Sequence, residues 1–193
     1  MTKPLLIIIA GPACTGKTTL GQYLAQELRL PFISKDGPKE LLFDCLGWSD
    51  RAWSRKVGRA SMEILFYFVE SQLRAAQSFI VESNFSPPFH AERFLKLKQQ
   101  YDFEPFQIQC ICEGKVLLER FKHRAESGVR HPGHVDQLNY EEFKPILLNG
   151  RYEPLEIGGR IYEVDTTDFV TLDYKKVLEE IRAALGKQGE FKG

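Results

Sequence analysis

The chain has 193 residues, 43% of them hydrophobic, and its 26 basic side chains balance 26 acidic ones. This length and composition predict one domain with a substantial core, and the balanced charge excludes an overall field that would draw the protein to nucleic acid or to a membrane. The four cysteines have neither zinc-ligand spacing nor the density of a secreted disulfide scaffold. The first apolar run is too short to span a bilayer and lacks a signal-peptide cleavage site, so we expect a cytoplasmic protein.

The first motif joins a predicted strand to a predicted helix. Residues 5–10 form a continuous apolar run, typical of a strand buried on both faces, and residues 19–28 carry an apolar stripe at helical spacing. Such a junction suits a loop that turns successive backbone N–H groups toward an anion beside a helix N-terminus. The loop satisfies the phosphate-loop pattern G-x-x-x-x-G-K-[ST] with Gly11, Pro12, Ala13, Cys14, Thr15, Gly16, Lys17, Thr18 and Thr19.

This loop predicts nucleotide-phosphate binding, with ATP and Mg²⁺ as the expected cofactors. Lys17 would contact the β- and γ-phosphates as a point charge, and the Thr18 hydroxyl would be a ligand of Mg²⁺. Cys14 is either a small residue tolerated in the loop or a thiol whose pKa is lowered by the helix N-terminus.

An acidic residue follows the second predicted strand, which covers residues 31–34. Asp36 stands directly after this strand, before Gly37-Pro38 and a helix that holds residues 39–43. Asp36 is therefore the cap of that helix, or a catalytic acid at the carboxyl edge of a sheet, or both.

A long helix is predicted over residues 50–76, because no proline interrupts an apolar stripe at helical spacing. Its polar side carries Arg51, Arg55 and Arg59 at positions i, i+4 and i+8. These arginines form either a solvated face or an anion-binding edge of a substrate pocket, and we include Arg59 among the candidate substrate-binding residues.

The third predicted strand, residues 78–82, ends in Glu82 and is followed by Asn84, and both join the candidate substrate-binding residues. Pro87-Pro88 predicts a loop before a helix over 89–101. A fourth strand over 106–112 and a helix over 114–126 follow. That last helix carries Arg120 and Arg124 one turn apart, and these arginines either pair with acids on an exposed helix or contact phosphate.

Residues 127–136 are rich in turn-forming residues and have little to bury, which is typical of a lid. The segment contains Arg130, His131 and His134. The two histidines could ligate a metal as His-x-x-His, but the Pro-Gly between them prevents both from lying on one face of a helix. We expect instead that they are hydrogen-bond donors of the lid or have no particular role. A helix over 139–148, a strand over 160–164 and a helix over 172–185 complete the chain.

Strands that alternate with helices predict an α/β fold, with a parallel sheet covered on both faces and a site at the carboxyl ends of its strands. The phosphate loop, the acid after the second strand, the Glu-Ser-Asn-Phe after the third strand and the Arg-x-x-x-Arg pair resemble small P-loop kinases over most of the chain. The group includes zeta toxins, chloramphenicol phosphotransferase and the kinase domains of polynucleotide kinases. The lid is similar to that of uncharacterised bacterial members, of the AAA-type ATPase kind.

The resemblance implies a P-loop NTPase fold with five strands in the order 2-3-1-4-5. It also implies that the acid after the second strand acts on an acceptor hydroxyl and that arginines of the lid region hold the transferring phosphate. By position, these roles fall on Asp36 and on Arg120, Arg124 and Arg130.

These features predict a kinase that moves the γ-phosphate of Mg·ATP to a hydroxyl of a small molecule, a nucleotide or a nucleic-acid 5′ end. In that reaction Glu82 either binds the acceptor or holds a Mg²⁺-bound water. The alternative is a nucleotide-dependent switch or repair-associated NTPase that has no phosphate acceptor. The third strand ends in Glu-Ser rather than the Asp-Glu pair of motor ATPases, which favours the kinase.

Overall fold

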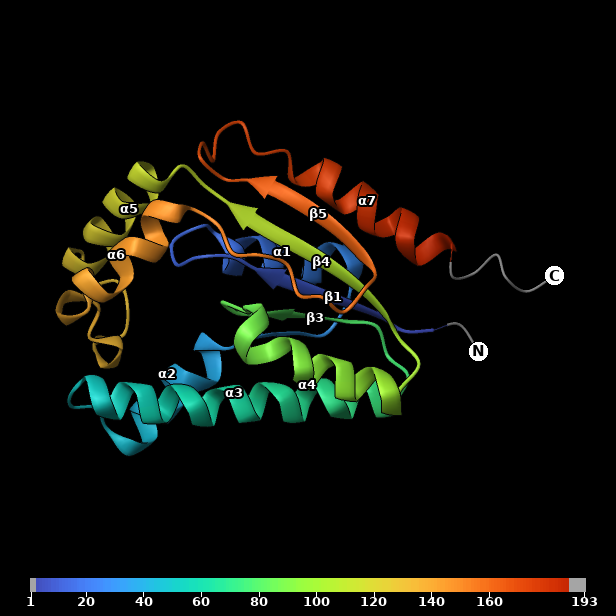
Figure 1. The fold of residues 1–193 in the computed structure, drawn as a ribbon, viewed down its shortest axis with the longest axis horizontal. Coiled ribbons are helices and arrows are strands. Elements are labelled where there is room, and N and C mark those ends of the chain that lie inside the picture. Colours follow the sequence, from blue (N-terminus) through green and yellow to red (C-terminus); the bar gives the residue numbers. More distant parts are fainter. Residues whose placement is uncertain (1–2, 188–193) are drawn as a thin grey trace.

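The apolar run at the start of the chain forms β1 (Leu5–Ala10), the central strand of a five-stranded sheet. The computed structural model, which describes residues 3–187, places the strands in the order β2-β3-β1-β4-β5, and all four pairings are parallel. No side chain of β1 is more than 1% exposed, because helices cover both faces of the sheet (Figure 1). The predicted fold class and strand order are therefore confirmed.

The remaining elements follow the predicted alternation. The other strands are β2 (Phe32–Ser34), β3 (Phe79–Glu82), β4 (Glu104–Ile111) and β5 (Arg160–Asp165). The helices are α1 (Lys17–Leu28), α2 (Asp36–Leu46), α3 (Arg51–Arg74), α4 (Pro87–Gln100), α5 (Gly114–Glu126), α6 (Tyr140–Asn149) and α7 (Tyr174–Lys187). Two short 3₁₀ turns, η1 (Pro132–His134) and η2 (Asp136–Leu138), interrupt the segment that the sequence predicts as a loop.

The alternation of side chains along β1 divides the core into two layers. Leu5, Ile7 and Ile9 pack in the cluster that includes α1 and α7, whereas Leu6 and Ile8 pack in the cluster that includes α3 and α4. Burying an aliphatic side chain of this size contributes roughly 1.5–3 kcal/mol to the stability of the fold. The side chains of β1 therefore stabilise the packing of helices on both faces of the sheet. A third, smaller cluster joins α5 to α6.

The structure corrects two predicted features at helix starts. Pro87 and Pro88 do not form a loop: they are the first residues of α4, where the missing N–H of proline has no intrahelical partner to lose. Asp36 is not a cap, because it is already the first residue of α2 and its side chain makes no capping hydrogen bond. Ser34 takes that role, since its Oγ accepts a hydrogen bond from the Gly37 N–H at 3.1 Å.

The carboxyl ends of the strands meet on one side of the molecule, the left side in Figure 1, where α5, α6 and the segment between them curve toward the starts of α2 and α3. The start of β1 and the end of α7 lie on the opposite side. Within the described residues, no helix is long and apolar enough to cross a membrane.

Candidate active site

The phosphate loop is held by backbone geometry that few residues other than glycine adopt. Gly11 has a φ of +145°, and a Cβ atom there would lie 2.3 Å from the carbonyl oxygen of Cys110. Gly16 has a φ of +76° and directly precedes α1. Cys14 also has a positive φ, of 66°, and burial raises the pKa of its thiol. That direction is opposite to the one a reactive loop thiol requires.

Lys17, Thr18 and Glu82 lie together at the junction of β1, α1 and β3. Lys17 Nζ donates to the carbonyl of Pro12 at 2.6 Å and lies 4.0 Å from Glu82 Oε1. The Thr18 hydroxyl donates to Glu82 Oε2 at 2.8 Å. Parallel pairing of Ile9 with Glu82 places this carboxylate beside the start of the loop.

The Thr18–Glu82 pair has the chemistry of a partial Mg²⁺ site. A hydroxyl and a carboxylate are hard oxygen donors, and Mg²⁺ commonly takes only one or two protein ligands beside phosphate oxygens and waters. Glu82 is only 6% exposed, and burial raises its pKa even though Lys17 opposes the shift. A cation there would keep this carboxylate ionised. Among the described residues there is no cluster of three or more acidic, His or Cys side chains that could hold a metal alone.

Asp36 forms an ion pair with Arg130 at the end of β2. Arg130 Nη2 donates to Asp36 Oδ2 at 2.7 Å. Burial by itself would raise the pKa of Asp36, but the positive charges of Arg130 and Lys35 outweigh burial and hold that pKa far below its usual range. The structure therefore brings together an acid and a lid arginine that the sequence places 94 residues apart.

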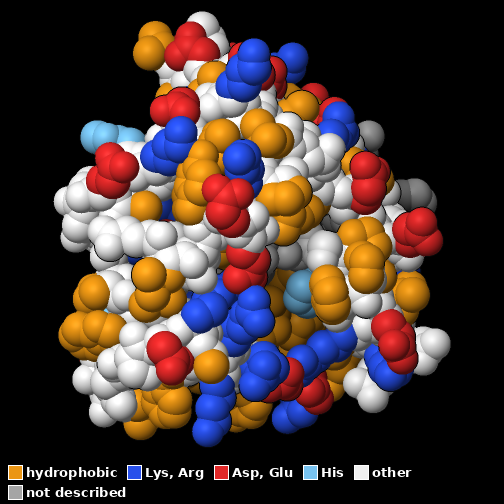
Figure 2. Space-filling model, turned by 60° about the vertical axis from the view of Figure 1, so that its left-hand side comes forward, with side chains coloured by type: hydrophobic (Ala, Val, Ile, Leu, Met, Phe, Trp, Pro, Cys, Tyr) orange, Lys and Arg blue, Asp and Glu red, His pale blue; other side chains and the backbone are white. Residues whose placement is uncertain are grey.

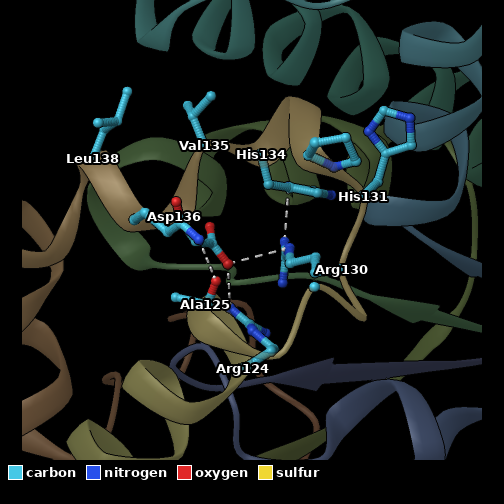
Figure 3. Close-up of a pocket in the computed structure, with 11 residues that line it drawn as sticks. Arg124, Ala125, Arg130, His131, His134, Val135, Asp136 and Leu138 are labelled. Atoms are coloured by element: carbon cyan, nitrogen blue, oxygen red, sulfur yellow. Dashed lines mark hydrogen bonds and ion pairs between the residues drawn. The ribbon is translucent and has the colours of Figure 1, made fainter.

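Arg124 and Arg130 converge on Asp136 in a pocket of about 400 Å³ (Figure 3). Arg124 donates to Asp136 Oδ2 at 3.0 Å, and Arg130 Nε lies 3.4 Å from the same oxygen. The Nε atoms of both arginines are buried without a hydrogen-bond partner. Two guanidinium groups with unused donors, held side by side, suit a phosphate group.

Arg120 lies elsewhere. Its guanidinium donates to the carbonyls of Thr166 and Thr167, each at 2.8 Å, and stacks 3.9 Å from the ring centroid of Phe169. That ring covers Gly16, since a Cβ at Gly16 would lie 2.8 Å from it. Arg120 thus ties the loop after β5 to the phosphate loop, and it does not share Asp136 with Arg124.

The two lid histidines are engaged by α2. His134 is 4% exposed, and its Nδ1 lies 2.9 Å from Arg130 Nη2 and 3.4 Å from Lys39 Nζ. Because both neighbours can only donate, Nδ1 is the acceptor and Nε2 carries the proton donated to Glu40 at 2.9 Å. Burial and Arg130 lower the pKa of His134 to about 2, so it is neutral. The expectation of a donor is therefore half right, since His134 donates through one nitrogen and accepts through the other.

The remaining candidates lie outside this arrangement. Arg51 and Arg55 both pair with Glu142 of α6, at 2.7 and 2.9 Å, which links α3 to the helix after the lid. Arg59 is exposed on α3, and the structure does not bring it to Asp36. Asn84 is exposed after β3, where its side-chain oxygen accepts a hydrogen bond from Ser83.

Sequence reasoning missed Lys35, Lys39 and Asp136. Lys39 is 5% exposed, which is rare for lysine, and it is four residues from Lys35, so both face the same side of α2. The four-residue spacing of Lys35 and Lys39 could have been recognised in the sequence as two cations on one helix face. The position of Asp136 between two arginines depends instead on the fold of the lid. The Lys and Arg side chains gathered on this face are visible in Figure 2.

The comparisons with known proteins agree with this geometry. The family described as an AAA domain, AAA_33, matches residues 6–145. A solved structure described as a "putative kinase" from Chloroflexus aurantiacus J-10-fl is 42% identical, with a TM-score of 0.88 over 94% of this chain and 98% of that one. No curated protein matches the chain.

More distant structures share the fold alone. A sugar kinase from Janibacter sp. HTCC2649 is 14% identical, with a TM-score of 0.55 over 96% of this chain and 95% of that one. A gluconokinase from Sinorhizobium meliloti 1021 is 17% identical, with a TM-score of 0.50 over 97% and 94%. The narrower resemblance to zeta toxins and their relatives stays a prediction. The chain belongs to the AAA domain family AAA_33 and has the fold of the P-loop kinases.

Proposed function

We propose that the protein is an ATP-dependent kinase that transfers the γ-phosphate of Mg·ATP to a hydroxyl of a small molecule, a nucleotide or a nucleic-acid 5′ end. One observation carries the proposal: the site has two separate carboxylates with different partners. Glu82 contacts Thr18 on the nucleotide side. Asp36 follows the neighbouring strand, β2, and is paired with the lid residue Arg130. A phosphoryl-transfer site needs this division, with one acid for the metal and another for the acceptor.

On the nucleotide side, Thr18 and Glu82 would hold Mg²⁺, and the metal would neutralise charge on the phosphates. Lys17 would leave its contact with the loop carbonyl for the β- and γ-phosphate oxygens. Arg124 and Arg130, which line one pocket, would stabilise the charge on the transferring phosphoryl. We propose that Arg120 supports this geometry by fixing the loop after β5.

On the acceptor side, Asp36 would orient the hydroxyl. The acceptor oxygen forms a bond to the γ-phosphorus while the bond from that phosphorus to the β,γ-bridging oxygen breaks, and ADP leaves. The hydroxyl proton passes to Asp36. The low pKa of Asp36 makes it a weak base while Arg130 is bound to it. A shift of Arg130 toward the phosphoryl group would raise that pKa at the stage when the hydroxyl loses its proton.

Residues 127–136 would act as the lid that excludes water from this step. They already contact α2 through Arg130–Asp36, His134–Glu40 and His131–Asp44. A lid that carries phosphate-binding arginines can couple closure to the presence of ATP.

The test is ATP turnover by the intact protein, alone and with pools of hydroxyl compounds, nucleosides and 5′-hydroxyl oligonucleotides. We expect slow ATP turnover by the protein alone and faster turnover with one of the pools. Lys17→Ala should abolish both the basal and the stimulated turnover. Turnover that no acceptor pool raises, in a protein that binds Mg·ATP, would favour the nucleotide-dependent switch instead.

A further inference from the structure

Two lysines at the start of α2 point at one position on α3. Lys35 precedes the first residue of α2 and Lys39 lies one turn further. Their Nζ atoms lie 3.7 and 3.8 Å from the point that a Cβ of Gly58 would occupy. Because Gly58 has no side chain, the two lysine side chains come up to this point on α3, where a methyl group would be in van der Waals contact with both.

Neither ammonium group has a carboxylate of its own. Within residues 3–187, no carboxylate oxygen lies within 4.0 Å of Lys35 Nζ or Lys39 Nζ, and the nearest polar partners of Lys39 are neutral: Ser54 Oγ at 3.1 Å and His134 Nδ1 at 3.4 Å. Asp36 is already paired with Arg130. Half-buried and buried cations of this kind are costly unless an anion accompanies them.

Two arginines also act on the lysines, against the opposing charge of Asp36. Arg130 approaches from the lid and Arg51 from the start of α3, and both lower the pKa of Lys39, although burial and Lys35 are the larger causes. An anionic group bound between the two lysines, beside Gly58, would relieve this repulsion and accept hydrogen bonds from both ammonium groups.

We propose that Lys35, Lys39 and Gly58 form a subsite for an anionic group, a phosphate ester or a carboxylate, carried by the acceptor whose hydroxyl faces Asp36. The inference rests on the proposed kinase function and narrows its substrate class to hydroxyl compounds that are already charged. Lys35 is adjacent to Asp36 in the chain, so one small molecule can reach both.

The first test measures binding without transfer. The phosphate loop is filled with Mg²⁺ and a non-hydrolysable ATP analogue, and methyl phosphate and acetate are titrated into the intact protein by calorimetry. We expect saturable binding of at least one anion. Lys35→Met or Lys39→Met should weaken it about tenfold or more, the usual effect of losing one charge-assisted hydrogen bond. The control is Lys96→Met, whose lysine pairs with Glu92 on the surface of α4.

Gly58→Ala separates the subsite from simple loss of stability. The new methyl group would meet only contacts of 3.6–3.8 Å, which are ordinary van der Waals distances, and alanine is the better helix former. The variant should therefore melt at a higher temperature than the wild type and yet bind the anion more weakly, because its methyl occupies the space between the ammonium groups. Equal anion affinity in wild type, Gly58→Ala and Lys39→Met would overturn the subsite.

The second test uses transfer from ATP to three matched acceptors: glycerol, glycerate and glycerol 3-phosphate. We expect the neutral alcohol to be the poorest acceptor, and the preference between the two anions identifies the group. Equal kcat/KM for all three would refute the subsite while leaving the kinase standing. Anion binding that depends on the lysines, without transfer to any hydroxyl compound, would instead retain the subsite and count against the kinase.

Discussion

Asp36→Asn separates a carboxylate that acts on the acceptor from one that only holds the lid. Asparagine keeps the size of the side chain but neither takes a proton nor balances the charge of Arg130. Since Ser34 rather than Asp36 makes the hydrogen bond to the helix start, the change costs no cap. The ion pair lost has side chains that are 39% and 20% exposed, and Arg130 keeps Asp136. We therefore expect a stability loss of only about 1 kcal/mol.

Transfer should fall far more than stability, by roughly 10²–10⁴-fold, the usual contribution of a positioned base, while the Kd for Mg·ATP changes little. The assay measures ATP binding and acceptor phosphorylation on the same variant. Asp44→Asn is the matched control, since Asp44 lies on the same helix and contacts the lid through His131 at 3.1 Å. Normal transfer by Asp36→Asn would refute the reasoning, and an equal loss in Asp44→Asn would assign the effect to lid docking.

Three further predictions concern the metal, the lid and pH. Glu82→Gln should raise the Mg²⁺ concentration needed for half-maximal turnover at least tenfold, as seen in Mg²⁺ titrations, and an unchanged requirement would remove Glu82 from the metal site. Gly133→Ala would place a Cβ 2.6 Å from the buried ring of Phe43, so limited proteolysis after Arg130 should become several-fold faster; unchanged cleavage would contradict a docked lid. Burial and Lys35 lower the pKa of Lys39 to about 8, so its ammonium form is lost as pH rises through 8, and the affinity for methyl phosphate should fall between pH 7 and 9. Lys35, Asp36, Arg51, Arg130 and neutral His134 also face this lysine. A flat profile would exclude Lys39 as the anion ligand.

The sheet and the phosphate loop could be predicted from sequence because their signals are local. A run of six apolar residues specifies β1, and the glycines and lysine after it specify the loop by chemistry alone. Once strands alternate with helices, parallel pairing brings Glu82 and Asp36 to the same edge. The position of Thr18 against Glu82 follows from that topology.

The lid side of the site was less predictable because its contacts span long stretches of sequence. Nothing local to Arg120 indicates that the carbonyls of Thr166 and Thr167 will engage it, so sequence spacing grouped it with Arg124. From sequence alone, Lys39 is an ordinary polar residue of a helix. Only the packing of α2 on α3 places it opposite Gly58. The sequence predicts a loop at Pro87 because proline both ends helices and begins them, and only the hydrogen bonds around it decide which.

The fate of the γ-phosphate is the measurement that tests the proposed function most directly. The intact protein is incubated with Mg²⁺, γ-labelled ATP and the acceptor pool that raises turnover, and the labelled products are separated. The kinase account predicts label in an organic phosphate ester, in a yield equal to the ADP formed above the background of hydrolysis, and no ester with Lys17→Ala. Label found only in inorganic phosphate, with or without acceptor, would contradict it.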